Sequence, residues 1–320
     1  MRKLIILSIA LQLCVAGLFG CPSPLNLPSP KWSGETPPPP TERGLGGETD
    51  TTPHGSIKIL SWNIQMLPKI VGDNGNDLRA GAIGEILKNT DYDIIIFQEA
   101  FTKISRERIW NLVQGVYPYQ SGKPLGKGLT LINSGVWIIS KLPIKTRVDK
   151  LYKECDGIDC FAKKGATLVE IEKDGRTFQV VGTHLQADQG KDKIKAREAQ
   201  YYDLAKLLEL NKKEGIPQIV AGDFNTLRSD TVRYTGMLNV LQADDGPLSG
   251  AQQYSWDNTR NDITYNSKDT SQVLLDYIFT RNNGFIFTNE IRIIRRFLLY
   301  WACTHADLSD HFAVEAKFEY

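Results

Sequence analysis

Five short polar clusters in this 320-residue chain carry side chains that can do chemistry. Each cluster follows or precedes a short apolar run of the kind that forms a buried β-strand. The clusters are Trp62-Asn63, Gln98-Glu99, Gly182-Thr183-His184, Gly222-Asp223-Phe224-Asn225 and Ser309-Asp310-His311. Because ligands in α/β proteins bind where strands end, we expect these clusters to line one cleft at the rim of a sheet. Carboxylates, amides and imidazoles together suit a hard metal ion and general acid-base chemistry.

The elements that must position these clusters are predicted from the apolar pattern. Strands are expected at residues 57–62, 93–97, 135–140, 166–171, 177–183, 217–222, 274–280 and 312–318. Two helices, residues 77–88 and 193–213, have apolar side chains on one face and charges on the other. Gly175 suits the tight turn of a hairpin. Hairpins mixed with helical crossovers predict two packed sheets with helices outside, not one parallel sheet.

The N-terminal segment is typical of an exported bacterial protein. Residues 1–21 begin with Arg2 and Lys3, continue with an apolar run too short to span a bilayer, and end at Cys21. The last four residues resemble a lipobox, which implies that Cys21 becomes the lipid-modified anchor of a membrane lipoprotein. The alternative is an ordinary signal peptide whose cleavage nearby gives a secreted protein. Residues 22–55 are rich in Pro and Gly and predict a disordered tether, so residues 56–320 form one domain.

Charge and cysteine content narrow the partners and the compartment. The formal net charge is only +1, so there is no strong basic field to attract nucleic acid, and no nucleic-acid partner is expected. We expect a monomer. Cys155 and Cys160 flank a turn-prone stretch, and export favours a disulfide between them. Metal binding by the same two thiols is the alternative.

The ordered motifs resemble the endonuclease/exonuclease/phosphatase superfamily and, within it, the neutral and bacterial sphingomyelinases. Beside the five clusters, the resemblance uses Gln65-Met66-Leu67, Ser134-Gly135-Val136, Lys164-Gly165 and Leu275-Asp276-Tyr277-Ile278, and it covers residues 57–318. It implies a DNase-I-like, four-layer α/β/β/α sandwich of two mixed sheets flanked by helices. It also implies metal-dependent hydrolysis of a membrane phospholipid phosphodiester, with sphingomyelin giving ceramide and phosphocholine. The implied cofactor is Mg²⁺, with Mn²⁺ or Co²⁺ as alternatives.

The same resemblance implies a role for each polar side chain. Glu99, Asn63 and Asp310 would hold the metal, although a salt bridge is the other interpretation of Glu99. His311 would be the general base, because imidazole titrates near neutral pH. Asp276 would orient that ring, unless it only caps its strand.

Four further residues are expected at the phosphate. Asp223 and Asn225 should alternate on one strand end and project the same way, with a plain Asx-turn as the alternative. His184 would contact the phosphate and help neutralise the leaving oxygen, although an isolated histidine is more often structural. Lys164 would supply a cationic contact, although exposed lysines are usually only solvated.

One apolar segment, residues 297–301, suggests contact with the membrane surface. Its aromatic residues Tyr300 and Trp301 follow two arginines, a combination that suits the headgroup region of a bilayer. A buried core strand is the alternative. At the level of function, the alternatives are another superfamily phosphodiesterase, that is a nuclease or a phosphoinositide phosphatase, and a non-catalytic membrane-binding lipoprotein.

Overall fold

The computed structural model describes residues 55–320 apart from residues 70, 73, 127–132 and 266. The expected signal sequence, Cys21 and almost all of the expected tether therefore lie outside the described residues. Within the described part of the chain, no helix is both long and apolar enough to cross a lipid bilayer.

The larger sheet has seven strands in the order β3-β4-β2-β1-β16-β13-β9. Their bounds are β1 (Ser56–Asn63), β2 (Ile94–Gln98), β3 (Tyr119–Gln120), β4 (Trp137–Ser140), β9 (Leu248–Ser249), β13 (Asn289–Arg295) and β16 (Ala313–Glu319). The central strand β1 pairs in parallel with β2 and antiparallel with β16. The sheet is therefore mixed, as the combination of hairpins and crossovers predicts.

The second sheet has five strands in the order β12-β8-β7-β6-β5. Their bounds are β5 (Thr146–Leu151), β6 (Gly165–Lys173), β7 (Arg176–His184), β8 (Gln218–Asp223) and β12 (Asp276–Arg281). β6 and β7 form the expected hairpin around Gly175, whose φ of 73° is the left-handed conformation that glycine adopts without a steric cost. β7 and β8 are parallel, because a helix connects them.

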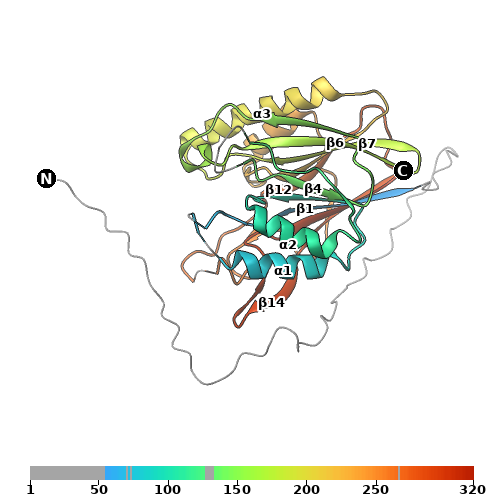
Figure 1. Cartoon of the computed structure of the whole chain (residues 1–320). Coiled ribbons are helices and arrows are strands. Elements are labelled where there is room, and N and C mark those ends of the chain that lie inside the picture. The colour runs from blue at the N-terminus through green and yellow to red at the C-terminus, as the bar shows by residue number, and fades with distance from the viewer. Residues whose placement is uncertain (1–54, 70, 73, 127–132, 266) are drawn as a thin grey trace, which may run out of the picture. The chain divides into compact units, whose positions relative to one another are not determined.

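Helices cover the outer faces of both sheets (Figure 1). α3 lies along the sheet that contains β6 and β7, whereas α1 and α2 lie on the opposite side of the sandwich. The helix bounds are α1 (Asn76–Leu87), α2 (Lys103–Val113), α3 (Lys191–Asn211) and α4 (Thr231–Leu241). There are also two small ribbons: β10 (Trp256–Asp257) with β11 (Gln272–Val273), and β14 (Leu298–Ala302) with β15 (His305–Asp307).

Two apolar clusters hold the layers together, and β1 contributes to both. Ile57 and Ile59 belong to the cluster between the sheets and under α3, whereas Leu60 and Trp62 belong to the cluster under α1 and α2. This assignment follows from the alternation of side chains along a strand. The two sheets are packed closely at Gly182, where an added Cβ would lie 2.6 Å from a methyl carbon of Ile96. A side chain at this position would push the sheets apart just before His184.

The predicted fold class is confirmed: two mixed sheets are flanked by helices. The expected strands and both expected helices occur, with ends shifted by one or two residues. The two-residue strands β3, β9, β10 and β11 are absent from the prediction. The longer elements that it lacks are α2, α4, β5, β13 and the β14–β15 ribbon. Their sequences carry exposed apolar or buried charged residues, such as Val232 in α4 and Arg292 in β13, which obscure the periodicity.

Candidate active site

Three of the predicted site residues form one row across neighbouring strands. His184 ends β7 and is paired in register with Asp223, the last residue of β8. Asp223 is in turn paired with Asp276, the first residue of β12. All three side chains are buried. Three residues that are far apart in sequence are thus held side by side by backbone hydrogen bonds at one rim of the five-stranded sheet.

The seven-stranded sheet supplies the facing residues. Asn63 ends β1, Glu99 follows β2, and Asp310 and His311 directly precede β16, which is antiparallel to β1. The side-chain amide of Asn63 donates to Asp223 Oδ2 at 3.0 Å, so the two sheets meet in this hydrogen bond. The expectation that the polar clusters share one rim therefore agrees with the geometry.

Sharp turns follow four of the strands that end at this rim. A non-glycine residue in the left-handed region occurs after each: Gln65 (φ 48°), Glu99 (φ 54°), Asp188 (φ 66°) and Asn225 (φ 51°). The expected alternation of Asp223 and Asn225 on one strand is wrong, since β8 ends at Asp223. Instead, the backbone N–H of Asn225 donates to Asp223 Oδ1 and its side-chain amide donates to the carbonyl of Leu185. Asp223 therefore makes an Asx-type turn with Asn225, and the Asn225 side chain ties this turn to the segment after β7.

His311 is paired with Asp276. Its Nδ1 lies 2.8 Å from Asp276 Oδ2, and its Nε2 faces Asp223 Oδ2 at 3.9 Å. Burial disfavours a charged ring, but the carboxylates of Asp276, Asp223 and Asp310 outweigh it and hold the pKa of His311 well above its usual value. The Asp276 contact fixes which ring nitrogen faces the site, which is the arrangement that a general base or acid needs.

His184 has the opposite electrostatic environment. Its Nε2 lies 2.6 Å from Lys164 Nζ and 3.5 Å from Asp223 Oδ2. Burial, together with the positive charges of Lys164 and His311, holds the pKa of His184 well below its usual value. A neutral His184 can therefore accept a hydrogen bond from the buried Lys164 ammonium group. The interpretation of Lys164 as a merely solvated lysine does not fit a side chain that is 4% exposed.

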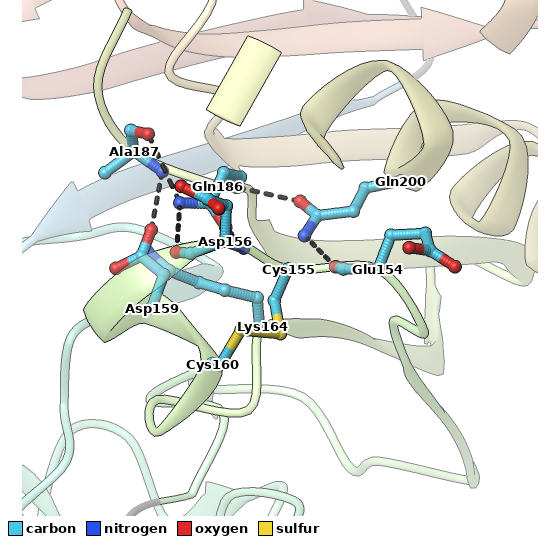
Figure 2. Close-up of a disulfide and its surroundings, with 9 residues drawn as sticks. All are labelled: Glu154, Cys155, Asp156, Asp159, Cys160, Lys164, Gln186, Ala187 and Gln200. Carbon is cyan, nitrogen blue, oxygen red and sulfur yellow. Dashed lines mark hydrogen bonds and ion pairs between the residues drawn. A yellow bond between two sulfur atoms is a disulfide. The ribbon is translucent and has the colours of Figure 1, made fainter. Parts of the chain in front are cut away.

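A disulfide-closed loop carries Lys164 to this position (Figure 2). Cys155 and Cys160 are joined with a Cα–Cα separation of 5.1 Å around the short 3₁₀ helix η2 (Gly157–Cys160). Asp159 Oδ2 accepts from the backbone N–H of Ala187 at 2.7 Å and lies 3.6 Å from Lys164 Nζ. The loop is thus docked on the segment that follows His184.

The site contains several buried carboxylates, and the nearby cations do not fully offset their negative charge. Burial and, next, Asp310 raise the pKa of Glu99 to about 7, and burial and Asp276 raise the pKa of Asp223 to about 6. Burial likewise raises the pKa of Asp310. One oxygen of Asp276, Oδ1, has no hydrogen-bond partner in the described part of the chain. Surplus negative charge and an unpaired oxygen fit a divalent cation.

Two different sets of oxygen and nitrogen atoms could hold such an ion. Among the described residues, the tightest grouping is Asp223, Asp276 and His311, whose ligand atoms lie within 4.8 Å of one another. The predicted set was Glu99, Asn63 and Asp310, of which Glu99 lies 3.9 Å from His184 Nε2. The Glu99 side chain is 19% exposed, so an ion from solvent can reach it.

Several contacts around the site were not predicted from the sequence. Gln65 Nε2 donates to Asp310 Oδ2 at 2.6 Å, and the Ser309 hydroxyl donates to the carbonyl of Asn63. The ring of Trp256 meets that of His311 edge to face, with centroids 5.1 Å apart. Gln65 and Ser309 lie inside recognisable motifs, so proximity in sequence could have found them. Trp256 lies outside these motifs, and its spacing in the sequence does not place it beside His311.

The apolar segment at residues 297–301 divides its side chains between two faces. β14 and β15 form a ribbon that projects beyond α1 (Figure 1). Tyr300 is 56% exposed, whereas Trp301 packs on the domain, with its indole N–H donating to the carbonyl of Asp307. The expectation that both rings face outward therefore holds for Tyr300 and not for Trp301.

The comparisons with known proteins agree with this arrangement. The model of the Endonuclease/Exonuclease/phosphatase family matches residues 60–311. A Sphingomyelinase C of Leptospira interrogans is 32% identical over 254 residues, which is 72% of this chain and 45% of that protein. A Phospholipase C of Staphylococcus aureus is 28% identical, covering 81% of this chain and 86% of that protein. A beta toxin variant from Staphylococcus aureus, crystallised with bound magnesium ions, aligns with a TM-score of 0.71 at 27% identity, over 82% of this chain and 99% of that one.

The chain therefore belongs to the Endonuclease/Exonuclease/phosphatase family. Within that family its relatives place it in the sphingomyelinase branch. The chain spans less than half the length of the Leptospira relatives that it matches.

Proposed function

We propose that this protein is a metal-dependent phosphodiesterase that hydrolyses a membrane phospholipid, with sphingomyelin giving ceramide and phosphocholine. The observation that carries the proposal is the pair of facing histidines at one rim. His311 is bound by a carboxylate, His184 is bound by an ammonium group, and Asp223 lies between them. Relatives named for sphingomyelinase and phospholipase activity, and a neighbour that binds magnesium, support the substrate class and the cofactor.

In the proposed reaction, a water oxygen attacks the phosphorus while the bond from phosphorus to the ceramide oxygen breaks. His311 takes the proton of the attacking water through Nε2, because Nδ1 is engaged by Asp276. Lys164 and His184 lie on the other side of Asp223, where a cationic N–H can stabilise a phosphoryl oxygen or protonate the leaving alkoxide. Asn225 would donate the second N–H of its side-chain amide to a phosphoryl oxygen, since the first N–H bonds the carbonyl of Leu185.

A divalent ion held by Glu99, Asn63 and Asp310 would offset the charge that develops on the phosphoryl oxygens. It would also offset the carboxylate charge that keeps His311 protonated, since that charge is what raises the histidine pKa. His311 can therefore act as a base near neutral pH once the surplus negative charge of the site is compensated. We propose Mg²⁺ as this ion.

The decisive test compares substrates and one carboxylate variant of the full chain. Release of the headgroup from sphingomyelin, release from phosphatidylcholine and cleavage of double-stranded DNA are measured with Mg²⁺ and with chelator. We expect Mg²⁺-dependent release from sphingomyelin and a loss of about 10²-fold or more in Glu99→Ala. Glu107→Ala, which removes an exposed carboxylate on α2, should retain full activity.

Three outcomes would contradict the proposal. Preferential cleavage of DNA would assign the site to a nuclease, and full activity in chelator would remove the metal. No hydrolysis of any substrate by a folded wild-type protein would favour a lipoprotein that only binds membranes.

A further inference from the structure

Two buried arginines lie directly behind the site, one in each outer helix layer. Arg79 in α1 is fully buried, and Arg197 in α3 is 1% exposed. A buried guanidinium group is costly unless its N–H groups are bonded, so the partners of each arginine show what it holds in place.

Arg79 joins the loop after β1 to the segment before β16. Its five N–H groups donate at 2.7 to 3.0 Å to the carbonyls of Ile64, Gln65, Asn74 and Leu308 and to the side chain of Asn76. Ile64 follows Asn63, and Leu308 stands two residues before Asp310. One planar group therefore fixes the separation of the two segments that carry these proposed metal ligands.

Arg197 makes the equivalent contacts on the other side of the sandwich. Its guanidinium group donates to the carbonyls of Gln186 and Asp188 and to the side chain of Gln189, at 2.7 to 3.0 Å. The Gln189 side chain continues to the carbonyl of Asn225 at 3.2 Å. Arg197 therefore holds the segment after His184 and, through Gln189, the turn after β8.

Each arginine also binds the carbonyl of a strained residue. Gln65 and Asp188 are non-glycine residues with φ of 48° and 66°, and their carbonyls accept hydrogen bonds from Arg79 and Arg197, respectively. Such a conformation is unfavourable for a residue that carries a Cβ and persists only where the surroundings impose it. Arg79 and Arg197 can impose this backbone conformation at the two turns, because each is held in place and donates several hydrogen bonds.

We propose that Arg79 and Arg197 are positioning residues of the active site, each acting on a different half of it. Arg79 sets the spacing of the Asn63 and Asp310 segments and so governs binding of the divalent ion. Arg197 sets the His184 and Asn225 turns and so governs the chemical step at the phosphate. This inference rests on the proposed function for its division of roles.

The test uses three lysine substitutions that keep the positive charge but lose the planar fork. The variants are Arg79→Lys, Arg197→Lys and, as a matched control, Arg281→Lys. Arg281 is also buried and bonds Gln218, but it lies at the opposite end of β8 and β12 from the Asp223–Asp276 pair. Mg²⁺ binding to the full chain is measured by calorimetry, the melting temperature is measured in chelator, and kcat and KM are measured on a soluble phosphodiester substrate.

We expect Arg79→Lys to weaken Mg²⁺ binding about tenfold or more, which is typical for groups that orient metal ligands. Arg197→Lys should bind Mg²⁺ within about twofold of wild type but lose about tenfold or more in kcat with little change in KM. Arg281→Lys should lower only the melting temperature.

Equal losses of Mg²⁺ affinity in all three variants, or unchanged affinity in Arg79→Lys, would overturn the assignment of Arg79. Unchanged kcat in Arg197→Lys would overturn that of Arg197. The calorimetric comparison needs no substrate. If the wild-type protein binds Mg²⁺ but hydrolyses nothing, the proposed function is wrong, whereas the proposed role of Arg79 in Mg²⁺ binding can still be tested.

Discussion

Among the individual residues, the two site histidines have opposite electrostatic surroundings and therefore opposite protonation states. His184, buried beside Lys164, is held neutral, whereas His311, surrounded by carboxylates, is held protonated in the metal-free protein. Two groups of the same type with opposite protonation are suited to opposite halves of an acid-base reaction. The carboxylates that create this difference also create surplus negative charge, and that charge has a measurable effect on stability.

Glu99 and Asp223 should make the metal-free protein less stable as pH rises. Their pKa values are raised on folding, from 4.5 to about 7 and from 3.8 to about 6, so the folded state binds protons more tightly than the unfolded state. The stability they contribute is present below the unfolded values and is lost as pH rises through about 6 to 7. In chelator we expect the melting temperature to fall between about pH 5 and pH 7.5. Saturating Mg²⁺ should abolish the fall.

A variant that lacks the Glu99 charge tests whether this carboxylate causes the fall in melting temperature. Glu99→Gln in chelator should melt roughly 2 °C or more above wild type at neutral pH, with little difference at about pH 5. Differential scanning calorimetry over the pH series measures both effects. A metal-free protein that becomes more stable over the same interval would show that the carboxylates are already compensated.

The types of the site residues could be predicted from the sequence, but most of their contacts could not. Polar side chains at strand ends are visible as motifs, and their common rim follows from the ends of paired strands. Arg79 and Arg197 gave no signal, because an arginine in a helix pattern is normally solvated and sequence does not show which carbonyls it binds. The turn at Asn225 was predicted only as the alternative, because the sequence does not show that this residue adopts a left-handed backbone.

At the level of elements, strands and helices were predicted correctly where the pattern of apolar residues is uninterrupted. β1 and β7 have near-continuous buried runs, and both were predicted. β13 was missed because its central Arg292 is buried and charged, a combination that apolar patterns exclude. The β14–β15 ribbon was recognised as an apolar segment, but the direction of each ring depends on register and on what lies beneath it.

The ribbon gives a prediction that separates membrane contact from packing. Tyr300→Ala should lower hydrolysis of sphingomyelin in liposomes severalfold and leave a soluble substrate unaffected, because the ring faces solvent. Trp301→Ala should lower the melting temperature, because its ring stacks on His305 with centroids 5.3 Å apart and packs against Gly75. Val232→Ala, which removes an exposed apolar side chain on α4, serves as the control. Equal loss on liposomes and soluble substrate in Tyr300→Ala would remove the membrane role of this ring.

For the whole molecule, attraction to a lipid surface cannot come from net charge. The formal net charge is +1, so an anionic membrane exerts little long-range pull on the chain. A short exposed apolar ribbon would provide contact only once the protein is already at a bilayer. We therefore propose that residues 1–55 keep the protein at the membrane. Residues 1–21 would direct export, Cys21 would carry the lipid, and residues 22–55 would form the tether.

Cys21→Ser tests this proposal in a bacterium that expresses the full chain. Acyl chains contribute about 0.8 kcal/mol per buried CH₂, so a doubly or triply acylated Cys21 would hold the protein on the membrane. Wild type should partition into the detergent phase and Cys21→Ser into the aqueous phase, with the same kcat on a soluble substrate. Ser23→Ala, two residues away, should behave as wild type. Aqueous partitioning of the wild-type protein would instead identify residues 1–21 as an ordinary signal peptide and the product as secreted.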